Sequence, residues 1–325
     1  MPRMEQITFA DHDIITKYLP FGLLIEQLEK AFSSETIVTP IRHHHDFKNP
    51  GEGIDSTLLL MPSWLPGSDL GVKVVTVSPN NTKYDLPSIQ GLYVLLDAHK
   101  GTPRLLLDAR ELTARRTAAT SALASKFLSR EDSDTLFMIG TGTLAPHLIQ
   151  AHATVRNLKQ VWIWGRDLVK AQIICDQLAN QKFNVGVTPS IKAGLEMADI
   201  VSCATLSAEA LVLGKDLKEG QHIDLVGAYK KDMREADDAV ILRSNVYIDS
   251  PTALKETGDL VIPLSSGVLD SDDIRGNLFQ LCQKKCNGRS RASEITLFKS
   301  VGHALEDLVA AQTVYEALVE SSDFG

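Results

Sequence analysis

The sequence has few of the residues that crosslink extracellular proteins or bind structural metals. Its 325 residues include only four cysteines, and only Cys282 and Cys286 stand close together, without a second pair to complete a zinc site. Scattered cysteines in a large chain are typical of free thiols in a reducing compartment. We therefore expect unpaired, buried thiols and no metal centre.

Other absences limit the location and the partners of the chain. The longest apolar runs, such as residues 58–61 and 92–96, are far shorter than the ~18 residues that a membrane helix needs. The first residues lack the apolar core of a secretory signal. Acidic residues outnumber basic ones, 41 to 33, whereas a broad nucleic-acid-binding face requires the opposite balance. We expect a cytoplasmic protein that binds neither membranes nor nucleic acids.

The residues that are present predict a first region of mixed α and β structure, about 110 residues long. Apolar residues at helical spacing predict a helix over 21–32. Short runs rich in β-branched residues predict four strands, at Thr57–Met61, Gly71–Val77, Gly91–Asp97 and Arg104–Asp108. Lys73 lies among valines in the second of these strands, which predicts a buried lysine.

The region from Thr113 onward is predicted to be a doubly wound α/β domain. An alanine-rich helix comes first, and strands and helices then alternate to about residue 300, the pattern of a parallel sheet. The expected strands are Leu136–Ile139, Val161–Trp164, Val185–Val187, Ile200–Ala204, Ile223–Val226, Val246–Asp249 and Ile295–Phe298. The expected helices include Leu144–His152, Leu168–Leu178 and one from Gly302 to about Val319.

A glycine turn between the first strand and helix of this domain predicts a dinucleotide site. The segment Gly140-Thr141-Gly142-Thr143-Leu144-Ala145 fits the pattern G-x-G-x-x-A in its required strand–turn–helix context. Amides at the start of such a helix receive the charge of a pyrophosphate. The alternative is a purely structural turn, but the context favours a Rossmann-type cofactor site.

The end of the second strand, Trp164-Gly165-Arg166-Asp167, indicates which cofactor binds. Arg166 stands near the position that meets the adenosine ribose, where it can pair with a 2′-phosphate. NADP(H) is therefore preferred, and NAD(H) remains possible because Asp167 can hold a 2′-hydroxyl. The alternative for Arg166 is a solvated side chain at the start of a helix.

Four cations in the first region form a second candidate site. Arg42, Lys73, Arg115 and Arg116 are suited to hold a carboxylate through guanidinium forks and an ammonium point charge. Structural salt bridges are the alternative. The nearby His43-His44-His45-Asp46 is interpreted as a polar loop and not as a metal site, because successive strand residues point to opposite faces.

Five segments occur in an order that resembles the ornithine cyclodeaminase/mu-crystallin family over nearly the whole chain. They are Leu60-Met61-Pro62, Gly71–Thr76, Thr113–Ala119, Ile139–Gly142 and Lys299-Ser300-Val301-Gly302. The resemblance implies a Rossmann domain, which we place at residues 115–311. It also implies an α+β domain for substrate binding and dimerisation, at residues 1–114 and 312–325, and hence a homodimer.

The resemblance also assigns roles to residues. Arg42, Lys73 and Arg116 would hold the substrate carboxylate beside Met61, and Lys73 and Asp307, along with water, are the candidate proton sources. The remaining expected site residues would bind the cofactor: Thr117, Gly140, Thr141, Gly142, Thr143, Leu144, Arg166, Ala204, Thr205, Val226 and Gly227.

Departures from one branch of the family narrow the expected reaction. Ornithine cyclodeaminases carry an Asp after the fifth strand, where this chain has Ala228 or Tyr229, so a substrate δ-ammonium would lack its partner. We expect reduction of a cyclic imino acid, Δ1-pyrroline-2-carboxylate to L-proline, and also Δ1-piperideine-2-carboxylate to L-pipecolate. The alternatives are an alanine dehydrogenase-like or ornithine cyclodeaminase enzyme, or a non-catalytic NADPH-dependent binding protein of the mu-crystallin type.

Overall fold

The computed structural model describes residues 7–321, which form two compact units. One unit combines the residues up to Arg116 with those from His303 onward, and the other is Thr117–Gly302. The second junction lies before residue 303 and not at the expected 311/312. The reason is that the whole of helix α11 (Ala304–Glu320) packs against strands β3, β4 and β5 of the first unit.

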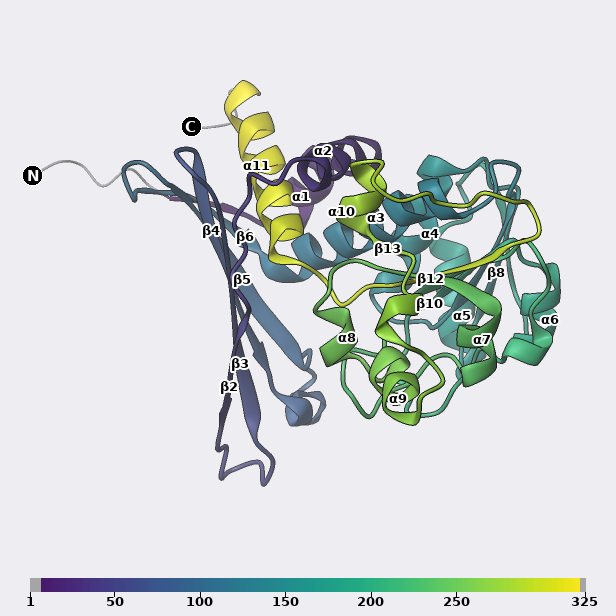
Figure 1. The fold of residues 1–325 in the computed structure, drawn as a ribbon. Helices are drawn as coiled ribbons and strands as arrows, with labels where there is room; N and C mark the ends of the chain where they lie inside the picture. The colour runs from purple at the N-terminus through teal and green to yellow at the C-terminus, as the bar shows by residue number, and fades with distance from the viewer. Residues whose placement is uncertain (1–6, 322–325) are drawn as a thin grey trace, which may run out of the picture. The chain divides into compact units, whose positions relative to one another are not determined.

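The first unit is built on a six-stranded sheet with the order β1-β6-β5-β4-β3-β2 (Figure 1). Its strands are β1 (Thr8–Ala10), β2 (His43–Phe47), β3 (Ser56–Leu65), β4 (Asp69–Val77), β5 (Ile89–Asp97) and β6 (Pro103–Asp108). All neighbours are antiparallel except the pair β1 and β6. Helices α1 (His12–Tyr18) and α2 (Phe21–Ser33) complete the unit with the turn η1 (Pro79–Tyr84) and α11. The four predicted strands and the helix at 21–32 are confirmed.

The two faces of this sheet carry different sets of residues, because successive side chains along each strand point to opposite faces. Lys73 on β4 lies directly between Met61 on β3 and Tyr93 on β5, and all three side chains are buried. One position along, Leu92, Val74 and Leu60 form an apolar row that is half-buried or exposed. Lys73 therefore lies on the covered face, which α11 packs against, and the other face is apolar and open within the unit.

The second unit is an eight-stranded parallel sheet with the order β13-β12-β14-β11-β10-β7-β8-β9, as expected for a doubly wound fold (Figure 1). The strands are β7 (Thr135–Ile139), β8 (Gln160–Trp164), β9 (Asn184–Val187), β10 (Ile200–Cys203), β11 (His222–Leu225), β12 (Ser244–Ile248), β13 (Gly276–Asn277) and β14 (Ile295–Lys299). All the predicted strands are confirmed, and β13 is additional. The core is apolar, with Phe137, Val201, Ile223 and Leu297 fully buried.

Helices and short helical turns connect these strands. The helices are α4 (Leu144–Val155), α5 (Leu168–Gln177), α6 (Ile191–Met197), α7 (Asp238–Arg243), α8 (Ala253–Glu256), α9 (Gly258–Ser266) and α10 (Leu278–Cys282). The turns are η2 (Gly214–Asp216) and η3 (Ser271–Asp273). Helix α3 (Ala109–Leu128) precedes the sheet, and the chain leaves the first unit within it, between Arg116 and Thr117.

The remaining sequence expectations have mixed outcomes. The polar loop expected at His43–Asp46 is wrong: these residues lie on the edge strand β2, where His43 is in register with Leu60 and all the side chains are exposed. The four cysteines are free, and three of them are buried. Within residues 7–321 no three His, Cys, Asp or Glu side chains are grouped to hold a metal ion. Across the same residues, every helix is too short or too polar to cross a membrane.

Candidate functional site

The glycine turn of the second unit leads from strand β7 directly into helix α4. Gly140 has a φ of 120°, and a Cβ there would lie 2.5 Å from the Ala204 carbonyl oxygen, so both backbone and space require glycine. A Cβ at Gly142 would instead point into open space. Ala145 is 1% exposed at the start of α4, which lets the helix pack closely on β7.

A cavity of about 300 Å³ lies beside this turn. Its lining comes from the ends of β7, β8 and β10: Gly140, Thr141, Gly142, Trp164, Gly165, Arg166, Asp167, Lys170, Ala204, Thr205, Leu206, Ser207 and Leu211. The carboxyl ends of parallel strands are where open α/β sheets bind ligands. The cavity thus combines amides of a turn and a helix start with the apolar surfaces of Trp164 and Leu206.

Of the charged residues that follow β8, Asp167 caps a helix, whereas Arg166 and Lys170 line the cavity. The Asp167 carboxylate caps helix α5 and accepts hydrogen bonds from the amides of Val169 and Lys170, at 2.9 and 3.4 Å. Arg166 is exposed at the cavity, and Lys170, which the sequence analysis did not single out, lines it from the first turn of α5. This wall therefore presents two cations, while its carboxylate is bound to the helix.

The structure gathers six of the predicted cofactor residues around the cavity, namely Gly140, Thr141, Gly142, Arg166, Ala204 and Thr205. Of the other predicted residues, Thr143 and Leu144 stand at the N-terminus of α4. Val226 and Gly227 follow β11, and Thr117 lies on α3, so these three do not line this cavity within the described part of the chain.

The second candidate site is a buried charge cluster in the first unit. Asp307, in the first turn of α11, accepts a hydrogen bond from the Lys73 ammonium at its Oδ1, at 2.9 Å, and its Oδ2 lies 2.8 Å from the same ammonium as an ion pair. Its Oδ1 also pairs with the Arg116 Nε at 3.0 Å. The Arg116 Nη1 also donates to Glu306 at 2.5 Å. Both carboxylates are fully buried, and Lys73 and Arg116 are 2% and 5% exposed. Asp307 therefore pairs with both Lys73 and Arg116, two of the cations that were predicted to bind the substrate.

The neighbours of the cluster determine how its groups ionise. Burial, and then the positive charge of Arg116, lower the pKa of Lys73 to about 8, against the opposing effect of Asp307. Burial raises the pKa of Asp307, but Arg116, Lys73 and Arg42 together hold it below its usual range. At neutral pH the cluster therefore contains an ionised carboxylate and a lysine close to its own titration.

Arg42 belongs to the same cluster through its charge. Its guanidinium contributes to lowering the pKa of Lys73, Asp307 and His303. The His303 Nδ1 accepts from the Leu305 amide at 3.4 Å, so its Nε2 is the atom that donates to the Thr39 hydroxyl at 3.2 Å. This bond ties the segment before Arg42 to the start of α11. Burial lowers the pKa of His303 to about 4, so the ring is neutral.

Arg115 does not join the cluster, and the expectation that it would is wrong. Its Nε pairs with Glu111 at 2.7 Å and its Nη1 donates to the Leu19 carbonyl at 3.0 Å. Adjacent residues of a helix point about 100° apart, so Arg115 and Arg116 serve different neighbours. Met61, the other predicted substrate residue, lies buried beside Lys73 in the register of the sheet.

Several residues that complete the two sites were not predicted from the sequence. His303 directly follows the motif Lys299-Ser300-Val301-Gly302 and Glu306 directly precedes Asp307, and these positions were the available signal. In the second unit, the Glu235 carboxylate bonds the amides of Thr205 and Gly227, which were both expected to meet the cofactor.

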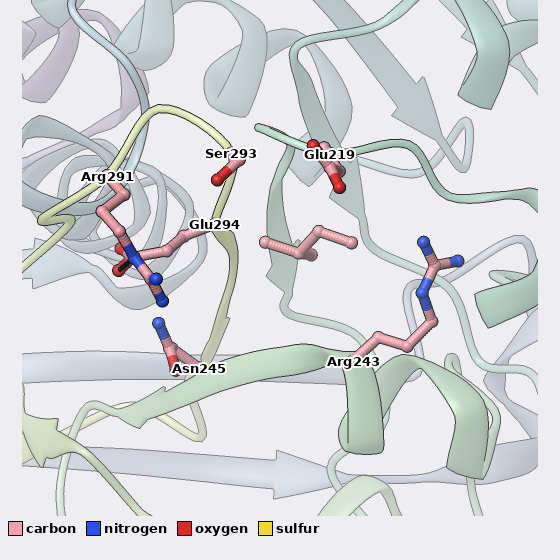
Figure 2. Close-up of a pocket in the computed structure, with 7 residues that line it drawn as sticks. Glu219, Arg243, Asn245, Arg291, Ser293 and Glu294 are labelled. Atoms are coloured by element: carbon pink, nitrogen blue, oxygen red, sulfur yellow. Dashed lines mark hydrogen bonds and ion pairs between the residues drawn. The ribbon is translucent and has the colours of Figure 1, made fainter.

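A second cavity, of about 310 Å³, lies at the amino ends of the parallel strands, away from the glycine turn. Figure 2 shows the side chains that line it. Its lining includes Asn245 and Ile295, at the amino ends of β12 and β14. Glu294 is held there by the Ser290 amide and by Arg291, and Arg243 donates to the Leu217 carbonyl at 3.2 Å. Its charged groups bind the surrounding loops, and the amino edge is not where such sheets bind ligands.

Comparisons with known proteins agree over the length of the chain. The model of the ornithine cyclodeaminase/mu-crystallin family matches residues 9–322. The protein SAR DEFICIENT 4 of Arabidopsis thaliana is 40% identical, covering 87% of this chain and 88% of its own. A Δ1-pyrroline-2-carboxylate reductase of Colwellia psychrerythraea is 38% identical, covering 93% and 96%. The structure of the Thermococcus litoralis Δ1-pyrroline-2-carboxylate reductase in complex with NADH and L-proline is 32% identical, covers 97% and 98%, and has a TM-score of 0.91.

Proposed function

Because the chain belongs to the ornithine cyclodeaminase/mu-crystallin family, we propose that it is a nicotinamide-dependent reductase of cyclic imino acids. The reaction is the reduction of Δ1-pyrroline-2-carboxylate to L-proline, with the six-membered Δ1-piperideine-2-carboxylate as a second substrate. The names of the relatives support this choice, and the Thermococcus litoralis enzyme holds NADH and L-proline together.

The observation that carries the proposal is the set of cations around one buried carboxylate. Lys73 and Arg116 both pair with Asp307, and the charge of Arg42 acts on the same carboxylate. Lys73 and Arg116 are 2% and 5% exposed, so a ligand that reaches them is largely shielded from water. Guanidinium and ammonium donors are also those that best bind a carboxylate.

Lys73 is the proton donor in this proposal. Reduction of the imine delivers a hydride to the ring carbon and a proton to the ring nitrogen, and a lysine with a pKa of about 8 can supply that proton near neutral pH. Asp307 is ionised and therefore holds the ammonium in place without donating a proton itself. When bound, the reduced nicotinamide supplies the hydride.

The cavity beside the glycine turn is the proposed cofactor site. Gly142 leaves room for a pyrophosphate, and the start of α4 supplies amides to it. NADP(H) is preferred, because Arg166 and Lys170 line the wall where a 2′-phosphate would lie, and one oxygen of the Asp167 carboxylate already caps helix α5. NAD(H) is the second choice.

The apolar outer face of the first unit's sheet is the proposed dimer interface. Phe9 and Leu92 are 48% and 44% exposed there. Leu106, Val94 and Val74 are half-buried on the neighbouring strands. A continuous apolar surface of this kind marks a protein–protein contact, and a second copy of the same sheet matches it.

The proposal is tested with the purified chain and NADPH, by following NADPH oxidation and L-proline formation with Δ1-pyrroline-2-carboxylate. The expected result is one L-proline for each NADPH oxidised. Pyruvate with ammonia and L-ornithine are run in parallel as substrates of an alanine dehydrogenase and of an ornithine cyclodeaminase. A chain that turns over either of these and neither cyclic imine contradicts the proposal.

A further inference from the structure

A second buried lysine cluster lies in the second unit, outside the residues assigned to chemistry. Lys299, at the end of β14, pairs with Asp259 of α9 at 2.9 Å and with Glu235 at 3.7 Å. All three side chains are at most 1% exposed. Asp259 also accepts from the amides of Glu235 and Ala236, at 2.7 and 3.3 Å, so it fixes the backbone that carries Glu235.

The Glu235 carboxylate spans two loops. One oxygen accepts from the Thr205 amide at 2.7 Å and from the Thr205 hydroxyl at 2.9 Å. The other accepts from the amides of Gly227 and Ala228, at 2.7 and 3.3 Å. Because Thr205 follows β10 and Gly227 follows β11, a single side chain joins the ends of two neighbouring strands.

The two loops approach so closely that only glycine fits. A Cβ at Gly227 would lie 2.0 Å from the Thr205 carbonyl oxygen and 2.6 Å from the Glu235 carboxylate. The sheet register places the ends of β7, β10, β11 and β14 at one level, so Lys299 sits in line with the glycine turn. The loop from Ala204 to Ser207 is one wall of the cofactor cavity.

We infer that Glu235 is a positioning residue for the cofactor: its carboxylate holds the Ala204–Ser207 wall at the distance that a dinucleotide requires. Lys299 and Asp259 hold Glu235 in turn. This inference rests on the proposed cofactor site. It assigns Glu235 no contact with the reacting atoms, since both of its oxygens are taken up by loop donors.

Glu235→Gln is the direct test. The change leaves Lys299 paired with Asp259, so one cation still faces one carboxylate and the fold should persist. The new amide group cannot accept from both loops, and one loop is released. We expect the Kd for NADPH, measured by its fluorescence on binding, to rise at least tenfold, and the KM for NADPH to rise more than the KM for the imine.

Two further measurements separate positioning from general stability. Amide exchange of Thr205, Gly227 and Ala228 should accelerate at least tenfold in Glu235→Gln, while that of the central strands stays unchanged. Glu235→Asp keeps the charge beside Lys299 but shortens the side chain by one methylene, and it should show a smaller loss of affinity. If Glu235→Gln does not fold, the NADPH affinity of Glu235→Asp tests the same inference.

Glu294→Gln is the matched control. Glu294 also accepts from a backbone amide and a hydroxyl, both of Ser290. It lines the other cavity (Figure 2) and lies directly before β14, at the amino end of the strand that Lys299 ends. Its change should leave the NADPH affinity within twofold. If folded Glu235 variants bind NADPH as tightly as the wild type, the positioning role is overturned. If the wild type binds neither NADPH nor NADH, the proposed function falls, and this inference with it.

Discussion

Each of the two units buries a lysine beside acidic residues, and the pKa values of these two lysines are shifted in opposite directions. Lys73 shares its surroundings with Arg116 and Arg42, and burial with these like charges lowers its pKa to about 8. Lys299 faces two carboxylates, Asp259 and Glu235, whose attraction outweighs burial and raises its pKa. A buried lysine with other cations nearby releases its proton more easily than one whose charged neighbours are carboxylates, which remains a fixed positive charge.

The contrast extends to what the carboxylates do. In the first unit they pair with Lys73 and Arg116, two of the cations proposed to hold the substrate. In the second unit they accept hydrogen bonds from backbone amides and hold loops, which makes them part of the fold. Under the proposed function, the same residue types therefore form a reactive centre in one unit and a scaffold in the other.

Replacing Lys73 should give the largest effect on chemistry. Lys73→Met removes the proton donor but leaves Asp307 paired with Arg116, so the chain should fold. We expect turnover of Δ1-pyrroline-2-carboxylate to fall by about 10³-fold, the usual scale of general acid catalysis, with NADPH affinity within twofold of the wild type. The control is Lys83→Met, an exposed lysine of the same unit. Unchanged kinetics in Lys73→Met would remove Lys73 from the mechanism.

Replacing the other buried lysine should affect folding instead. Lys299→Met leaves Glu235 and Asp259 without their cation, and loss of one member of a buried ion pair costs about 3–5 kcal/mol. We expect the free energy of unfolding, from urea titration, to drop by that amount. A variant as stable as the wild type but inactive would reverse the roles given to the two lysines.

The charge at the cofactor cavity should have a smaller and more selective effect. Arg166→Ala removes a charged hydrogen-bond donor to the proposed 2′-phosphate, worth about tenfold in affinity. The Kd for NADPH should rise by that factor and the Kd for NADH should stay within twofold, with Lys170→Ala showing the same trend more weakly. Equal losses for both cofactors would mean that Arg166 does not distinguish them.

Acid should weaken the second unit by a modest amount through His222. Burial lowers the pKa of His222 to about 3, while the unfolded chain takes up a proton below pH 6.5. Stability from the neutral ring is thus complete above pH 6.5 and is lost as the pH falls toward 3. The loss is about 1.5 kcal/mol between pH 6.5 and 5. His222→Gln should flatten this part of the pH profile in urea titrations, and an unchanged slope would contradict the assignment.

The sequence predicted the regular elements well because most strands carry apolar or β-branched runs. Strand β2 was missed because its residues are all exposed and four of the five, His43 to Asp46, are polar, so the strand shows no apolar alternation. Strand β1 has only three residues, and its partner β6 lies almost one hundred positions away in the chain. Edge strands of this kind are defined by pairing, which a local pattern does not record.

The cofactor cavity was predicted from the sequence more completely than the buried charge cluster. The glycine turn is local, so its residues and their neighbours around the cavity were found together. Lys73 stood out because it interrupts a valine strand, but its partner Asp307 is 234 positions away and has the appearance of an ordinary first-turn acid. Whether Arg115 or Arg116 joins the cluster depends on the rotation of α3, which the sequence does not fix.

The pH dependence of kcat/KM for Δ1-pyrroline-2-carboxylate tests the central claim, that Lys73 is a proton donor tuned by its cationic neighbours. Lys73 is protonated below its pKa of about 8, so activity should fall above that pH, approaching tenfold for each further unit. Arg166→Ala leaves the Lys73 cluster intact, so its kcat/KM should fall above the same pH as that of the wild type. A profile that stays flat from pH 7 to 9.5 would contradict the account.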